Sequence, residues 1–212
     1  HVAFVKKSDL LILKELRSNK FKSKIIKVNT GINDNFVKKV NNNYFITETN
    51  KENLSFVLAL SKKLNLKNNL LIKAINNFKG LKYRQQIIYK NKILTVINDS
   101  KSTSFSSSIG VLKSNNNIYW LLGGIHKKGD KFNLPKKYYN NIKAFIFGKN
   151  KNFFIKALRG KIEYKNFYSL NDALKKVISI IKKEKLTQKT VLFSPCAASF
   201  DTFKNFEDRG FY

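Results

Sequence analysis

A polar stretch between a predicted strand and a predicted helix holds the side chains best suited to chemistry. Residues 93–97 are apolar or β-branched and predict a buried strand, and apolar residues at helical spacing begin at Phe105. Ligands of open α/β sheets lie beyond the carboxyl ends of strands, where helix N-termini attract anions. Three side chains at this place could bind such a ligand: Asp99, Lys101 and Thr103. A capped loop with a solvated lysine is the simpler explanation, and spacing alone favours it.

Two more predicted strands end in residues that suit a ligand. The glycine pair 123–124 follows the apolar run 118–122, and glycines let the backbone turn tightly or approach a ligand closely. The lysine pair 127–128 comes next. After the strand predicted at 191–193, small residues lead to the hydroxyl of Ser199. Each pattern is weak alone, but parallel strands would bring all three ends to one edge of a sheet.

The order of the predicted elements divides the chain at Gly80, into domains 1–79 and 80–212. In the first domain we expect strands at 2–5, 24–28 and 44–48 and helices at 9–17, 50–64 and 69–78. The second helix should bury Leu54, Val57, Leu58, Ser61 and Leu64, and the third Leu71, Ile75 and Phe78. Arg84, just past the junction, could reach a phosphate on the neighbouring domain, although a surface arginine is the simpler explanation.

In the second domain, strands and helices alternate. Strands are predicted at 86–89, 93–97, 118–122, 144–147, 162–164 and 191–193. The clearest helix starts at Ser169, with Asp172 completing a start like a capping box. Its apolar stripe should be Leu170, Ala173, Leu174, Val177, Ile178 and Ile181. The alternation predicts an α/β fold with a Rossmann-like, mainly parallel sheet and helices on both faces.

Composition limits the class of protein. The 212 residues are 42% hydrophobic and 13% aromatic, enough for a core. No apolar run approaches the roughly 18 to 20 residues of a membrane span, so we expect no membrane partner. The single cysteine, Cys196, fits a reducing cytoplasm, and without a histidine near it in sequence we interpret it as a small buried residue, not a nucleophile. The chain begins at His1 and has no methionine, which predicts a fragment of a longer reading frame.

The net charge of +29 raises nucleic-acid binding as an alternative function. The basic residues are almost all lysines spread along the chain, and the arginines are only Arg17, Arg84, Arg159 and Arg209. Base and phosphate recognition relies on the planar fork of arginine. We therefore interpret the charge as codon bias on solvated faces and expect no nucleic-acid partner, while a lysine-rich nucleic-acid-binding α/β protein stays the alternative.

Several stretches resemble signatures of the Mur ligases that add D-glutamate to UDP-N-acetylmuramoyl-L-alanine. Residues 98–103, NDSKST, resemble the family's NDSKAT(N), and residues 194–210, SPCAASFDTFKNFEDRG, resemble SPACASFDQFKNFEQRG over a length that excludes chance. Residues 80–84, GLKYR, keep three letters of GLPHR, and residues 49–53 resemble HNxxN weakly. Other Mur ligases and folylpolyglutamate synthases carry DYAHTP or DGAHNP at the central site, so Asp99-Ser100-Lys101 indicates the D-glutamate-adding member. A related ligase of one of those kinds stays an alternative. Departures from the signatures include Thr49, Lys82, Tyr83, Ser104 and Cys196, and roles tied to the replaced residues do not carry over.

The resemblance implies roles for particular residues. Asn53, Arg84 and Asp99 would face ATP, with Asp99 at the ribose, and Lys101 would lie between nucleotide and amino acid as the catalytic residue. D-glutamate would be held by Thr103, Lys127, Ser199 and the backbone of Phe206. Lys128 takes the place of Lys127 if the alignment slips by one residue, and His126 would be only a loop residue.

The resemblance also implies an activity and a domain plan. ATP with Mg²⁺ would convert the carboxylate of UDP-N-acetylmuramoyl-L-alanine to an acyl phosphate, which the amine of D-glutamate attacks. Residues 1–79 would be the last part of the central ATPase domain and 80–212 the C-terminal ligase domain of a monomeric, cytoplasmic bacterial enzyme. The sequence has no Gly-x-x-x-x-Gly-Lys-Ser/Thr loop for phosphates. That loop and the metal ligands are therefore expected upstream, and this chain alone is expected to be inactive.

Overall fold

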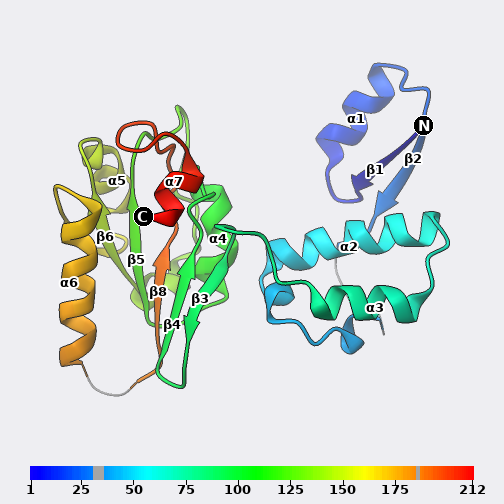
Figure 1. Cartoon of the computed structure of the whole chain (residues 1–212). Helices are drawn as coiled ribbons and strands as arrows, with labels where there is room; N and C mark the ends of the chain where they lie inside the picture. Colours follow the sequence, from blue (N-terminus) through cyan, green and yellow to red (C-terminus); the bar gives the residue numbers. More distant parts are fainter. Residues whose placement is uncertain (31–35, 185–186) are drawn as a thin grey trace. The chain divides into compact units, whose positions relative to one another are not determined.

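The computed structural model describes residues 1–30, 36–184 and 187–212 and divides the chain into two compact units, 1–79 and 80–212 (Figure 1). We call them unit 1 and unit 2 and describe each by itself.

Unit 1 combines two parallel strands with helices. Strands β1 (Val2–Lys6) and β2 (Lys24–Val28) pair with each other in parallel, and helix α1 (Leu10–Ser18) connects them. The Asp9 carboxylate accepts a hydrogen bond from the Ile12 amide at 3.1 Å and so caps α1. Two short 3₁₀ helices, η1 (Val37–Lys39) and η2 (Asn43–Ile46), precede helices α2 (Glu48–Lys63) and α3 (Asn68–Asn77).

The strand predicted at 44–48 is wrong, because capping residues turn this stretch into helices. Asn42 accepts from the Tyr44 amide at 2.9 Å and donates to the carbonyls of Ile75 and Phe78 at 2.7 and 2.8 Å. Thr47 then caps α2 by accepting from the Asn50 amide at 3.3 Å. Local side-chain hydrogen bonds therefore override the aromatic and β-branched composition that suggested a strand.

The predicted helix stripes of unit 1 are correct only in part. Leu54 and Ile75 are buried at 0% and 5% exposure. Val57 and Leu64 are 44% and 58% exposed, and Phe78 is 38% exposed. Helix α2 packs on η2, β1 and β2, and those neighbours, not residue type, decide which arc of the helix is covered.

Unit 2 is built on a six-stranded sheet with the order β3-β4-β8-β5-β6-β7. The strands are β3 (Gln86–Lys90), β4 (Leu94–Asn98), β5 (Ile118–Gly123), β6 (Ile142–Phe147), β7 (Glu163–Asn166) and β8 (Lys189–Phe193). Only β3 is antiparallel to its neighbour, and the other four pairings are parallel. The predicted α/β fold with a mainly parallel sheet is confirmed.

Helices cover both faces of this sheet. On one face, α4 (Phe105–Lys113) and α5 (Lys151–Leu158) bury residues against Trp120 of β5. On the other, α6 (Leu170–Lys183) packs Ala173 and Val177 against Tyr119 and its neighbours. The remaining elements are η3 (Lys136–Asn141) and the short helix α7 (Phe206–Phe211).

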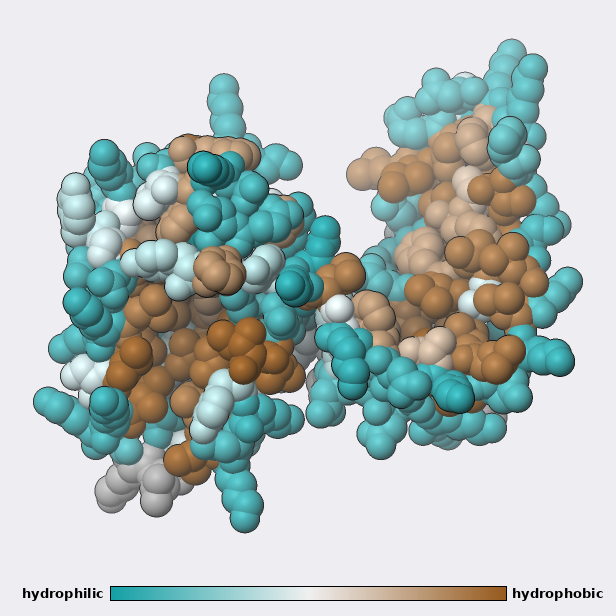
Figure 2. All heavy atoms as spheres, viewed as in Figure 1, coloured by the Kyte–Doolittle hydropathy of each residue, from teal (hydrophilic) through white to brown (hydrophobic). Residues whose placement is uncertain are grey.

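Helix α6 begins as predicted. Ser169 accepts from the Asp172 amide at 3.1 Å, and its hydroxyl donates to the Asp172 carboxylate at 2.6 Å. The predicted burial of Ile178 is wrong, since its side chain is 51% exposed at the margin of the arc centred on Ala173 and Val177. Figure 2 shows apolar side chains at the surface between α6 and the β3–β4 hairpin, where Ile88 is also 56% exposed.

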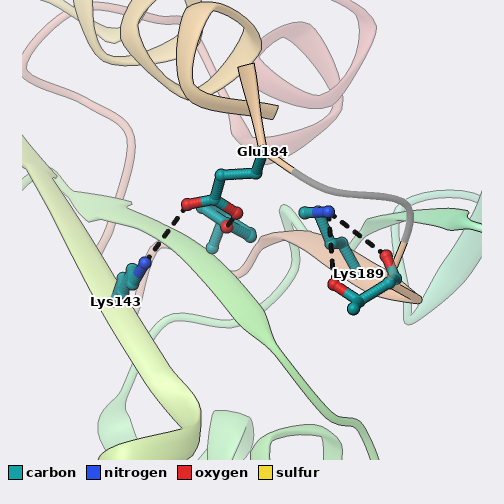
Figure 3. A network of polar contacts seen from close by, with 5 residues as sticks. Lys143, Glu184 and Lys189 are labelled. Atoms are coloured by element: carbon teal, nitrogen blue, oxygen red, sulfur yellow. Dashed lines mark hydrogen bonds and ion pairs between the residues drawn. The ribbon is translucent and has the colours of Figure 1, made fainter. Parts of the chain in front are cut away.

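A network of charged side chains closes the amino edge of the sheet (Figure 3). The Tyr119 hydroxyl donates to Glu184, and Lys143 contacts the same carboxylate at 3.3 Å. Lys189 donates to the carbonyl and hydroxyl of Thr187 at 3.2 and 3.3 Å. The Tyr119 hydrogen bond, with help from Lys143, lowers the pKa of Glu184, while burial and the neighbouring carboxylate raise the pKa of Tyr119.

Candidate functional site

Three adjacent parallel strands, β4, β8 and β5, end at one edge of the sheet in unit 2. The residues that follow them form three loops: 98–104 after β4, 194–205 after β8 and 123–130 after β5. Six of the eight side chains singled out in the sequence lie in these loops or at the start of α7: Asp99, Lys101, Thr103, Lys127, Ser199 and Phe206. This edge, defined by the three loops, is the carboxyl edge and the candidate site.

Asp99 is held from two sides in a buried position. One carboxylate oxygen accepts from the Gln85 amide at 3.0 Å and the other from the Ser194 hydroxyl at 2.7 Å. Its exposure is 5%, and burial raises its pKa to about 7. The hydrogen bonds of Ser194 and Gln85 and the charge of Arg84 act in the opposite direction, but burial dominates. The carboxyl group is therefore poised to change its charge near neutral pH.

Lys101 and Phe206 are brought together from distant parts of the chain. The Lys101 ammonium lies 3.8 Å from the centre of the Phe206 ring, a cation–π contact. The Lys101 amide donates to the Tyr83 carbonyl at 2.9 Å, and the Ser100 hydroxyl donates to the Phe206 carbonyl at 2.8 Å. These contacts fix the direction of the lysine where the loop meets α7.

The loop after β5 is pinned at both ends around Lys127. Ile125 and Ala198 exchange backbone hydrogen bonds of 3.0 and 2.8 Å, which join this loop to the one after β8. Asp130 accepts from the Phe105 amide at 2.7 Å and so ties the loop to the start of α4. Lys127 itself is exposed between these two anchors.

Position 124 requires glycine, because the Ala198 carbonyl lies close to it and because its backbone φ is positive. Its φ is +122°, and a Cβ at this position would lie 2.5 Å from the Ala198 carbonyl oxygen. No other residue could stand there without moving the backbone of the loop after β8. The paired glycines thus serve the contact between two loops.

The other predicted site residues take different positions. Ser199 is 2% exposed, and its carbonyl accepts from the amides of Thr202 and Phe203 at 3.1 and 2.9 Å. Thr103 and Arg84 are exposed in unit 2. Asn53 is exposed on α2 of unit 1.

Cys196 and His126 have structural surroundings. Cys196 is fully buried and free, and burial raises the pKa of its thiol well above the usual range. It is therefore a poor nucleophile, as the sequence predicts. The His126 ring stacks on Phe153 with 3.9 Å between the ring centres.

Arg209 contributes to the site although no sequence pattern assigns it a role. It is 2% exposed, and its Nε and Nη2 donate to the Ser100 hydroxyl and carbonyl at 3.1 and 2.7 Å. Burial lowers its pKa to about 10, so it stays charged at neutral pH. Gly210, next to it, faces the Tyr83 ring so closely that a Cβ would clash. An arginine inside a short helix looks like a surface residue in sequence, so only the tertiary structure reveals these contacts.

Two negative findings concern the part of the chain that the structure describes. Within it, no group of three or more His, Cys, Asp or Glu side chains is placed to hold a metal ion. None of the described helices is both long and apolar enough to span a membrane.

The sequence is similar to curated ligases over most of its length. It is 35% identical over 164 residues to a UDP-N-acetylmuramoylalanine–D-glutamate ligase of Wolbachia sp. subsp. Brugia malayi, which is 76% of this chain and 32% of the relative. It is 32% identical over 189 residues to the ligase of the same name from Rickettsia bellii, 86% of this chain and 42% of the relative. The chain thus spans only about a third to two fifths of the length of these relatives. No family model matches it.

Solved structures show the same fold at low sequence identity. MurF from Acinetobacter baumannii superposes with a TM-score of 0.71 at 18% identity, over 92% of this chain and 49% of that one. A bifunctional folylpolyglutamate synthase/dihydrofolate synthase from Yersinia pestis, complexed with AMPPNP and Mn, gives a TM-score of 0.60 at 8% identity over 99% of this chain and 52% of that one.

The fold is therefore that of the Mur ligases and folylpolyglutamate synthases. Within that class, the sequence is related to the UDP-N-acetylmuramoylalanine–D-glutamate ligases, and the resemblance seen in its signatures is confirmed.

Proposed function

We propose that this chain is part of an ATP-dependent ligase that adds D-glutamate to UDP-N-acetylmuramoyl-L-alanine in bacterial peptidoglycan synthesis. The observation that carries the proposal is the carboxyl edge, where Asp99, Lys101, Thr103, Lys127 and Ser199 follow three adjacent parallel strands. Their signatures are those of the D-glutamate-adding ligases, and the curated relatives have that name. A folylpolyglutamate synthase shares the fold, and the NDSK stretch at 98–101 is the feature that favours a D-glutamate-adding ligase over that class.

The nucleotide would bind on the side of Asp99. A carboxylate that already accepts from Gln85 and Ser194 retains lone pairs for a ribose hydroxyl. Arg84, whose charge acts on Asp99, is exposed and free to reach a phosphate. Asn53 is proposed as a further residue that contacts the nucleotide.

D-glutamate would bind beside the loops after β5 and β8. Lys127 would pair with one of its carboxylates, with Lys128 as the alternative, and Thr103, Ser199 and the backbone of Phe206 would bind the rest. Because Ile125 and Ala198 join these loops directly, the groups that surround the amino acid would be held in a fixed geometry.

The chain's own residues would act in catalysis by holding charge. Lys101, directed by its contact with the Phe206 ring, would stabilise the anionic groups that meet when the amine attacks the acyl phosphate. Mg²⁺ supplies charge neutralisation of the phosphates in such reactions. The described residues include no acidic cluster that fits the ion, so we assign no metal ligand and no metal-dependent step to them.

The test of this function is stereospecific binding. Ligand-observed NMR on the 212-residue chain should show binding of D-glutamate and little binding of L-glutamate. Lys127→Ala should weaken D-glutamate binding about 10- to 150-fold, because a hydrogen bond to a charged group contributes roughly 1.5 to 3 kcal/mol. The same variant should leave ATP binding nearly unchanged.

Lys128→Ala is the matched control, since it removes the same charge one residue away. Equal loss in both variants would mean that the lysines act only as a general positive field. Failure of the wild-type chain to distinguish the two enantiomers would refute the proposed D-glutamate site.

A further inference from the structure

A chain of buried hydroxyl groups runs behind the candidate site. The Ser194 hydroxyl, which donates to Asp99, lies 2.5 Å from that of Ser108 on α4. Ser108 in turn lies 2.6 Å from the Ser102 hydroxyl and 2.9 Å from the Cys196 sulfur. All four of these residues are at most 2% exposed. Ser108 is thus the point where polar groups from both loops meet.

The direction of the hydrogen bonds follows from counting donors. Each hydroxyl donates once and accepts up to twice. Ser194 gives its hydrogen to Asp99, so it accepts from Ser108. Ser108 has then used its hydrogen and accepts from Ser102 at 2.6 Å, a contact shorter than the 3.4 Å from the Ser102 hydroxyl to the Ser104 carbonyl. The Cys196 sulfur is the other neighbour of Ser108, and its thiol also lies 3.5 Å from the Ser194 carbonyl. The bonds from Ser102 through Ser108 and Ser194 therefore point toward the Asp99 carboxylate, and such bonds strengthen one another.

Two departures from the family signatures meet at this cluster. The signature NDSKAT has alanine at the position of Ser102, and SPACAS has alanine at the position of Cys196. In this chain both positions carry a polar atom, and both atoms contact the same Ser108 hydroxyl. Both departures therefore add a polar contact to Ser108 in this chain.

We propose that Ser108 is a positioning residue of the candidate site, which acts through Ser102 and Ser194 to fix the loops after β4 and β8 together. The first loop carries Asp99, Lys101 and Thr103 and the second carries Ser199. The inference rests on the proposed function for its ligands, but the link between the loops does not depend on it.

The first experiment needs no ligand. Hydrogen exchange of the 212-residue chain is measured for the wild type and Ser108→Ala. We expect faster exchange at amides in both 98–103 and 194–199, with β6 unchanged. Ser114→Ala is the control, because it removes a hydroxyl at the opposite end of α4 that bonds only within the helix, to Gly110 at 2.9 Å. Faster exchange throughout unit 2, or in one loop only, would overturn the proposal.

The second experiment measures binding of ATP and D-glutamate. Ser108→Ala should weaken both about 5- to 10-fold, since a buried hydroxyl partner is lost on each side. Ser108→Thr keeps the hydroxyl and should restore both affinities, and absence of rescue counts against the proposal. If the wild type binds neither ligand, the proposed function fails, while the exchange experiment still decides the role of Ser108.

The pH profile separates positioning from a general loss of structure. The charged group that acts on Asp99 is the Arg84 guanidinium, and it is not changed in Ser108→Ala. Without the hydroxyl chain the Asp99 carboxylate is less stabilised, so the midpoint of ATP binding against pH should move upward. An equal loss of affinity at every pH would contradict this role.

If Ser108→Ala does not fold, Ser102→Ala should show faster exchange in 98–103 alone, and no change there would also overturn the proposal.

Discussion

The two edges of the sheet in unit 2 use ionisable groups in opposite ways. At the amino edge, Glu184 is 33% exposed in its side chain, contacts Tyr119 and Lys143, and has a lowered pKa. At the carboxyl edge, Asp99 is buried among hydroxyl and amide groups, and burial raises its pKa to about 7. The first carboxylate is satisfied by its neighbours, whereas the second is held at an electrostatic cost, which is typical of groups that await a ligand.

The largest effect should come from filling the space at Gly124. Gly124→Ala would place a Cβ 2.5 Å from the Ala198 carbonyl at a φ of +122°, so we expect a loss of roughly 2 to 5 kcal/mol in the free energy of unfolding. Gly160→Ala is the control, because Gly160 lies before β7, also has a positive φ, of +71°, and has nothing within 4 Å of its Cβ position. It should cost only about 1 kcal/mol in urea unfolding. Equal losses of unfolding free energy would mean that the close approach of Gly124 to Ala198 adds nothing to the cost of a positive φ.

The next effect should be a gain of stability from removing the buried charge. A folded pKa of about 7 against 3.8 in the unfolded chain means that the native state binds the extra proton. The associated stability is complete below about pH 4 and is lost as the pH rises through 7. Asp99→Asn should therefore be more stable than wild type by roughly 2 to 4 kcal/mol at pH 8 and similar to it at pH 4. Urea unfolding at both values tests this, and a variant that is less stable at pH 8 would disprove the assigned direction.

The amino edge should respond weakly and with the opposite sign. Glu184→Gln removes a carboxylate whose lowered pKa stabilises the fold above its unfolded value of 4.5, a contribution that is lost as the pH falls. Because the pair with Lys143 is partly exposed, we expect less than about 1 kcal/mol at pH 7 and no difference at pH 3. A larger effect of this variant than of Asp99→Asn would reverse the comparison.

The smallest expected effect concerns lysines, which occur at both edges of the sheet. If the charge of +29 has no nucleic-acid role, binding of a mixed-sequence oligonucleotide should be weak at physiological salt. Fluorescence anisotropy across a salt series measures this. Sub-micromolar affinity with a steep salt dependence would favour the nucleic-acid alternative instead.

Much of unit 2 could be predicted because its signals are local. The apolar runs of β5 and β8 and the Ser169 cap of α6 lie within short windows of sequence, and the alternation of elements implies one common edge for the strand ends. Unit 1 was harder, since the Asn42 hydrogen bonds that produce η2 reach to the end of α3.

The site was predictable only as a set of positions along the chain. Asp99 and Lys101 could be chosen from their signature, but their roles stay predictions. The contacts of Arg209 with Ser100 and of Ser108 with Ser194 join residues far apart in sequence, and no periodicity encodes such pairs. The identity of a residue such as serine also does not reveal whether it lies in a buried network or in solvent.

Helix α7 forms hydrogen bonds with residues far away in the sequence, and this has a consequence for the order of folding. Asn98 donates to the Gly210 carbonyl, Ser100 to the Phe206 carbonyl and Arg209 to Ser100, across 112, 106 and 109 residues. Contacts of such separation form late, since the intervening chain must be ordered before they contribute. During synthesis, the loop after β4 leaves the ribosome long before its partners do and waits without them. A nascent chain would therefore pass through a state in which the sheet can begin to form while the candidate site does not yet exist.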